Sequence, residues 1–193
     1  DLTASSPAYL TPYQSPLNIN SCEFSNVINK LRTFFLNRGF IEVHTQNRLS
    51  ILAACEDPFT VSTYNYTNTT WPLPQTGQMW LEYELLNNPD IPGCFCLSTS
   101  YRNEPNPVEG RHEKLFPMFE FESHGGMDKL EEMEEELLEF LGFGNEHGKI
   151  KYDEACKKYG VDELDYDEEE ALCKDFTPCT FLTDFPLRTH PFW

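Results

Sequence analysis

Apolar residues recur at helical spacing near the start of the chain. They are Phe24, Val27, Ile28, Leu31 and Phe35. This periodicity ends at the polar, glycine-containing segment 37–39, and the strand-like segment FIEVHT, residues 40–45, follows. The spacing predicts a helix with one apolar face and then a strand.

A second pattern, over residues 100–122, predicts two strands joined by a polar, proline-bearing loop. This segment carries several charged and aromatic side chains: Arg102, Glu104, Arg111, His112, Phe116, Glu120 and Glu122. Because side chains alternate between the two faces of a strand, Phe116, Glu120 and Glu122 are expected on one face.

This set of side chains suits a nucleotide. A guanidinium such as that of Arg102 can bind a phosphate and a carboxylate together, and the ring of Phe116 can stack on a base. From the loop, Arg111 or His112 can reach the outer phosphates, while Glu104 can accept a hydrogen bond from an adenine amino group. A charged surface hairpin with a ladder of salt bridges is the alternative interpretation.

Two further segments are read from their polarity. Residues 128–141 predict a helix whose apolar stripe packs on a core while acidic residues cover the rest, and we expect no chemistry there. The stripe is formed by Leu130, Met133, Leu137 and Leu141. Residues 61–77 are rich in Thr, Asn and Pro, which suits either a lid over a pocket or a surface excursion that does not move.

The segments RNE, RHEKLF and FEFE within residues 102–122 resemble motif 2 of the class II aminoacyl-tRNA synthetases, in the aspartate and asparagine branch. The resemblance implies that Arg102 contacts the α-phosphate and the amino-acid carboxylate. It also implies that Glu104 and Phe116 hold adenine and that His112 or Arg111 contacts the γ-phosphate.

The amino-acid site is assigned by the same resemblance. TGQMWLE, residues 76–82, is similar to the SGQLxxE segment of asparaginyl-tRNA synthetases, which implies that Gln78 faces the substrate amino group. Glu56 falls where the family places a glutamate near the same ammonium, and we expect Glu120 and Glu122 to complete this amino-acid site. Leu81 stands where the aspartate-specific enzymes carry a lysine, which favours asparagine over aspartate.

The predicted helix and strand near the N-terminal side resemble motif 1, which implies a homodimer, although Gln46 follows Thr45 where the motif has a proline. An amphipathic helix packed on a sheet without a partner is the alternative. Motif 3 and an anticodon-binding domain have no counterpart in residues 1–193. We therefore expect a single class II catalytic core with an α+β fold, an antiparallel β-sheet flanked by helices. It is either a portion of a longer polypeptide or a degenerate paralogue.

Charge and composition bear on the partners. Fourteen Lys and Arg against 32 Asp and Glu give a net charge of −18, which disfavours tRNA, a polyanion, without excluding it. No apolar run approaches the ~20 residues of a membrane span, and no leader is visible, so we expect a cytoplasmic protein.

The seven cysteines show no zinc-binding spacing and are expected to be reduced, with Cys94 and Cys96 on one strand face.

Together these features predict an AMP-forming ligase that activates asparagine or aspartate with ATP and Mg²⁺, as an asparaginyl-tRNA synthetase-like enzyme. We assign no protein ligand to the metal. Two alternatives stay open: a stand-alone asparagine synthetase that uses aspartate, ATP and ammonia, and a non-catalytic paralogue that binds a nucleotide.

Overall fold

The computed structural model describes residues 19–49, 58–176 and 179–189. Its contacts divide the chain into two compact units, residues 1–123 and 124–193. The expectation of one catalytic core over residues 1–193 stays a prediction. No helix in the described ranges is long and apolar enough to cross a bilayer.

The sheet of the first unit is built on a long hairpin. Its strands lie in the order β1, β4, β5, with β1 parallel to β4 and β4 antiparallel to β5. Their bounds are Ile41–Glu42 (β1), Gly93–Tyr101 (β4) and Leu115–Ser123 (β5). The β4–β5 hairpin, with its polar loop, is the arrangement that the sequence predicted.

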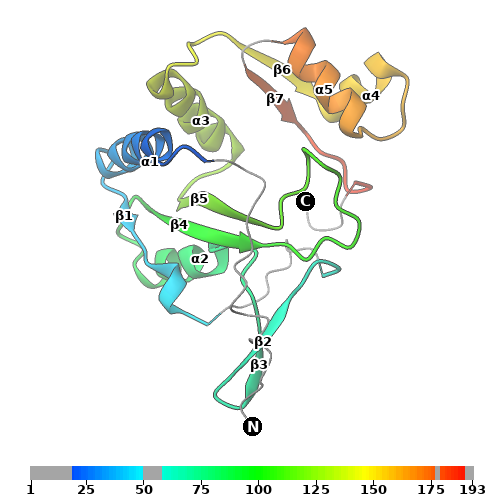
Figure 1. Ribbon diagram of the computed structural model, residues 1–193. Helices are drawn as coiled ribbons and strands as arrows, with labels where there is room; N and C mark the ends of the chain where they lie inside the picture. Colours follow the sequence, from blue (N-terminus) through cyan, green and yellow to red (C-terminus); the bar gives the residue numbers. More distant parts are fainter. Residues whose placement is uncertain (1–18, 50–57, 177–178, 190–193) are drawn as a thin grey trace. The chain divides into compact units, whose positions relative to one another are not determined.

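Helix α1, Ser21–Leu36, packs aromatic rings against one face of this hairpin (Figure 1). Phe35 is completely buried, and its ring lies 5.5 Å from that of Phe119 and 4.8 Å from that of Phe121. The predicted helix is confirmed, but its buried side is rotated relative to the predicted apolar stripe. Phe34, outside that stripe, is buried, whereas Val27, within it, is 49% exposed.

Helix α2, Gln78–Asn87, lies on the opposite face (Figure 1). Leu81, which is fully buried, forms a core cluster with Val43, Cys94 and Cys96. Cys94 and Cys96 therefore share one strand face, as predicted, and the six cysteines in the described part of the chain are free thiols.

The predicted loop 61–77 contains a second hairpin. Strands β2, Thr63–Tyr66, and β3, Thr69–Pro72, pair antiparallel. Thr67 and Asn68 connect them with φ angles of 51° and 59°, the left-handed values of a tight two-residue hairpin turn. The sequence interpretation as a loop is wrong over these strands.

A short 3-10 helix, η2, spans Thr45–Asn47.

The second unit contains the acidic helix α3, a parallel pair of strands and two helices between those strands. The elements of this unit are α3 (Met127–Leu141), β6 (His147–Lys151), α4 (Tyr152–Tyr159), α5 (Tyr166–Asp175) and β7 (Cys179–Thr183). The predicted apolar stripe of α3 is confirmed, with Met133 buried. With helices against a mainly antiparallel sheet in the first unit, the α+β fold class is confirmed.

Candidate active site

The register of the β4–β5 hairpin gathers the predicted strand residues on one face. Ser100 lies opposite Phe116, Cys96 opposite Glu120, and Cys94 opposite Glu122. Directly opposite residues of an antiparallel pair project to the same side. The face that α2 covers in part therefore carries polar side chains on both strands, among them Ser100, Glu120 and Glu122, beside the ring of Phe116.

Arg102 follows β4 and extends the hairpin pairing, since its backbone N–H donates to the carbonyl of Lys114 at 2.9 Å. Its side chain turns back along the strand, with Nε donating to Ser100 Oγ at 3.0 Å and Nη1 donating to Gln75 Oε1 at 3.0 Å. Because Ser100 lies opposite Phe116, the guanidinium of Arg102 and the ring of Phe116 share one face of the hairpin.

The partners of Arg102 are neutral. In contrast, three other arginines bind carboxylates, in the pairs Arg32–Glu42, Arg48–Glu84 and Arg188–Asp153. Within residues 19–49, 58–176 and 179–189, Arg102 pairs with no carboxylate. In a chain of net charge −18, this guanidinium keeps its full charge for an anionic ligand.

The Glu120 carboxylate holds the start of α2. It accepts hydrogen bonds from Thr76 Oγ1, from the Gly77 backbone N–H at 2.8 Å and from Ser98 Oγ at 2.6 Å. The Thr76 hydroxyl in turn accepts from the Gln78 backbone N–H at 3.0 Å. The Cys96 thiol donates a fourth hydrogen bond to Glu120 Oε2, at 3.8 Å, so the roughly four acceptor positions of the carboxylate are occupied. Negative charge at a helix N-terminus is also favourable.

Gly77 is required by this close approach. A Cβ atom at position 77 would lie 2.8 Å from Cys96 Sγ and 3.2 Å from Glu120 Oε2. Any side chain would therefore push the helix start away from the strand.

Gln78 binds the second acidic residue of the face. Its Nε2 donates to Glu122 Oε1 at 2.9 Å. Burial raises the pKa of Glu122, the bond from Gln78 opposes this, and the charges of Glu82 and Glu120 raise it further. The end of the face near Gln78 therefore attracts a cationic group.

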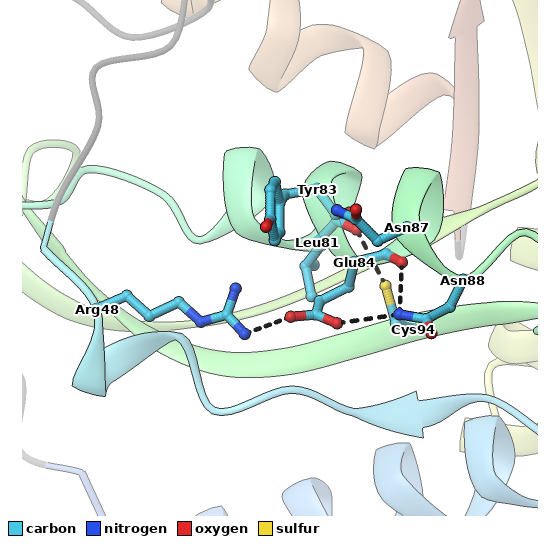
Figure 2. Close-up of polar contacts among 7 residues, drawn as sticks. All are labelled: Arg48, Leu81, Tyr83, Glu84, Asn87, Asn88 and Cys94. Atoms are coloured by element: carbon cyan, nitrogen blue, oxygen red, sulfur yellow. Dashed lines mark hydrogen bonds and ion pairs between the residues drawn. The ribbon is translucent and has the colours of Figure 1, made fainter.

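A polar network fixes α2 against neighbouring segments (Figure 2). The Glu84 carboxylate accepts from the Arg48 guanidinium and, at 3.3 Å, from Asn88 Nδ2. On the strand side, the Cys94 thiol donates to the Leu81 carbonyl at 3.3 Å. The helix that carries Gln78 is thus tied both to the segment after β1 and to β4.

A pocket of about 160 Å³ opens beside the start of α2. Residues lining it include Arg48, Tyr64, Thr76, Trp80 and Tyr101. Thr76 and Gly77, which neighbour the predicted Gln78, also line it, but among the described residues none of those predicted to bind the substrate does. We therefore locate the candidate active site on the polar face of the hairpin.

The other predicted residues lie in the connecting loop or outside the described ranges. Glu104, Arg111 and His112 belong to the loop between β4 and β5, and Glu56 lies outside the described residues. His112 Nδ1 accepts from the Val108 backbone N–H at 3.0 Å. In the neutral imidazole this leaves the proton on Nε2, where it can be donated to a ligand.

The cysteines of the polar face are not nucleophiles. Burial raises the pKa of Cys94 to about 11 and that of Cys96 to about 12. Both remain thiols at neutral pH, and a thiol is a weak nucleophile.

Sequence reasoning missed the groups that orient the predicted residues. They are Thr60, Gln75, Thr76, Ser98 and Ser100. A usable signal was present, because small polar residues at alternate positions of an otherwise buried strand indicate that its inner face is polar.

Residues 13–193 match the family described as tRNA synthetases class II (D, K and N). The chain belongs to this family. The comparison with curated proteins gives no match.

Solved structures of class II synthetases share the fold. The asparaginyl-tRNA synthetase of Pyrococcus horikoshii, complexed with asparaginyl-adenylate, has a TM-score of 0.71 and 22% identity, covering 86% of this chain and 44% of that one. The Entamoeba histolytica enzyme, also with asparaginyl-adenylate, has a TM-score of 0.67 and 18% identity, covering 88% and 44%. The chain thus spans less than half the length of these enzymes.

Proposed function

We propose that the protein activates asparagine with ATP, as an asparaginyl-tRNA synthetase-like, AMP-forming ligase. The observation that carries the proposal is the Arg102 guanidinium, held by two neutral oxygens on the same hairpin face as Phe116, Glu120 and Glu122. Adenylate binding by the two asparaginyl-tRNA synthetases of like fold supports it.

The charges on this face are ordered as the two substrates require. The Gln78–Glu122 end would bind the ammonium of the amino acid, and Arg102 would bind its carboxylate together with the α-phosphate. Phe116 and Glu104 would hold the adenine, while Arg111 or His112 would contact the outer phosphates. Because Glu120 already accepts four hydrogen bonds, its acceptor positions are occupied. It would act on the ammonium through its charge and by holding the Gln78 segment in place.

The reaction needs no protein nucleophile. A carboxylate oxygen of the amino acid attacks the α-phosphorus, the bond to the bridging oxygen of pyrophosphate breaks, and pyrophosphate leaves with that electron pair. Arg102 stabilises the charge that develops on the α-phosphate oxygens.

Magnesium is not assigned to protein ligands. In the described ranges no three His, Cys, Asp or Glu side chains converge as a metal site. ATP brings its own phosphate oxygens for Mg²⁺, which would neutralise part of their charge.

Two features favour asparagine over aspartate. Leu81, at the position of the aspartate-pairing lysine, is fully buried in the core cluster. In addition, Glu82, Glu120 and Glu122 make the local charge negative, which would repel a second substrate carboxylate.

Amino-acid-dependent exchange of pyrophosphate into ATP tests the proposal, run in the full-length protein with asparagine and with aspartate, each with and without tRNA. We expect exchange with asparagine. Exchange with aspartate together with ammonia-dependent formation of asparagine would instead establish the asparagine synthetase alternative. ATP binding without exchange would leave the non-catalytic paralogue.

The homodimer is also a proposal. Helix α1 and strand β1 correspond to the motif 1 segments through which the family dimerises. Light scattering during size-exclusion chromatography should give twice the mass of one chain, and a monomer mass would contradict it.

A further inference from the structure

Gln75 is a fully buried polar side chain directly before the TGQ segment, with 0% of its surface exposed. Burying an amide is costly unless its groups are hydrogen-bonded. Its Oε1 accepts from Arg102 Nη1 at 3.0 Å, and its Nε2 donates to the hydroxyl of Thr60, itself buried, at 3.1 Å.

The Gln75 bond completes the fixation of the Arg102 guanidinium. Ser100 takes the Nε hydrogen and Gln75 takes one on Nη1. Two bonds on different nitrogens of a planar group fix the orientation of its plane. Nη2 has no protein partner among the residues that the structure describes, so its hydrogens are available to a ligand.

The chemical type of this partner matters. A glutamate at position 75 would have nearly the same shape but would form an ion pair with Arg102 and cancel much of its charge. A glutamine accepts the same hydrogen bond and leaves that charge to a phosphate. The backbone supports the arrangement, since Tyr101 N–H donates to Pro74 O at 2.9 Å and Asn103 N–H donates to Thr60 O at 2.8 Å.

We propose that Gln75 is the positioning residue of Arg102: it orients the guanidinium toward a phosphate and, as a neutral acceptor, keeps its charge intact. This inference rests on the proposed function in so far as the phosphate belongs to ATP. The residue acts through Arg102 and does not touch the substrate.

A charge-changing variant with little change of shape tests the role. For Gln75→Glu we expect the kcat of pyrophosphate exchange to fall about tenfold or more, with the KM for the amino acid unchanged. In an Arg102→Ala background, Gln75→Glu should cause no further loss. Asn145→Asp, the same amide-to-carboxylate change at an exposed position between α3 and β6, should leave exchange within twofold. Full exchange by Gln75→Glu, or an equal loss with and without Arg102, would overturn the proposal.

A spectroscopic readout separates this inference from the proposed function. The Arg102 Nε–Hε signal in an NMR spectrum should shift when ATP is added to the native protein, and this shift should be much weaker in Gln75→Glu. If the shift occurs but no amino acid supports exchange, the positioning role stands and the activation reaction falls. If ATP does not move the Arg102 signal in the native protein, or moves it equally in the variant, the inference is wrong.

Discussion

One face of the β4–β5 hairpin packs aromatic rings against α1, whereas the opposite face bonds polar groups to α2 and the segment before it. The first face is held by the rings of Phe35, Phe95, Phe119 and Phe121. In the pairs of these rings that contact each other, the ring centroids lie 4.8 to 5.7 Å apart. The second is held by hydrogen bonds to Glu120, Glu122 and Arg102. Contact area stabilises one face, and directed bonds set the geometry of the other.

The difference shows how one pair of strands can serve two purposes. Apolar packing does not depend on exact direction, so the α1 face can supply stability without specifying any ligand. The polar face gains less from burial, but each side chain in it points in a direction set by a partner. Changes to the two faces should therefore be separable by measurement.

Phe35→Ala should have the largest effect. Removing a fully buried ring from the aromatic face is expected to lower the free energy of unfolding by about 3–5 kcal/mol. Urea denaturation measures the change. Phe143→Ala removes a ring that is 51% exposed and should cost about 0.5 kcal/mol. Equal losses for the two variants would refute the assignment of Phe35 to the core.

Arg102→Ala should act on activity rather than on folding. Loss of the α-phosphate contact is expected to cost about 3 kcal/mol in the transition state, roughly a hundredfold or more in rate. Pyrophosphate exchange measures it, with thermal unfolding as a check on the fold. Arg188→Ala, in an exposed ion pair, is the matched control. A variant at position 102 with native exchange would disprove the phosphate contact.

Glu120→Gln should affect both the stability of the fold and the activity, each to a smaller degree. The amide cannot accept from Thr76, Gly77 and Ser98 as the carboxylate does, because its NH₂ group would face donors. We expect a loss of about 1–3 kcal/mol in unfolding free energy and a higher KM for the amino acid. Glu132→Gln, at an exposed site of α3, serves as control. An unchanged KM would argue that Glu120 does not hold the Gln78 segment for binding.

The pH dependence contributed by Glu122 should be the smallest effect. Burial raises the pKa of Glu122 in the folded protein, so the folded state binds a proton more readily than the unfolded chain does. The resulting stabilisation is fully present below the pKa of the unfolded chain and is lost as pH rises through the folded pKa.

Glu122→Gln removes this titration. The unfolding free energy of the native protein minus that of the variant should therefore decrease as pH rises from about 4 to 7, a range that starts near an ordinary glutamate pKa. Urea denaturation at several pH values measures it. A difference that grows with pH would mean that Glu122 is stabilised as the anion.

The sequence located the hairpin and its charged face because both follow from alternation along two strands. Phe116, Glu120 and Glu122 were predicted to share a face, and the register confirms it. The roles of Arg102, Gln78 and the loop residues came from the family resemblance, and their contacts with substrate stay predictions. The class II fold itself is confirmed by the family match and the similar structures.

What the sequence could not supply were contacts set by tertiary structure. Phe34 is buried although it does not belong to the predicted apolar stripe of the helix. The Arg38 guanidinium lies 3.5 Å from the centre of its ring. The β2–β3 turn was missed because Thr67 and Asn68 adopt left-handed conformations, which usually call for a glycine in such a turn. Gln75 belongs to no periodic pattern, and its proposed role depends on a contact with Arg102, which is distant in sequence.

Four consecutive residues, 75–78, bond to both ends of the proposed substrate site: Gln75 to Arg102 and Gln78 to Glu122. Local opening of this segment would release the phosphate end and the ammonium end in one event. Binding of ATP or of the amino acid should then slow amide hydrogen exchange throughout the segment, so that each substrate raises the affinity for the other by ordering residues 75–78.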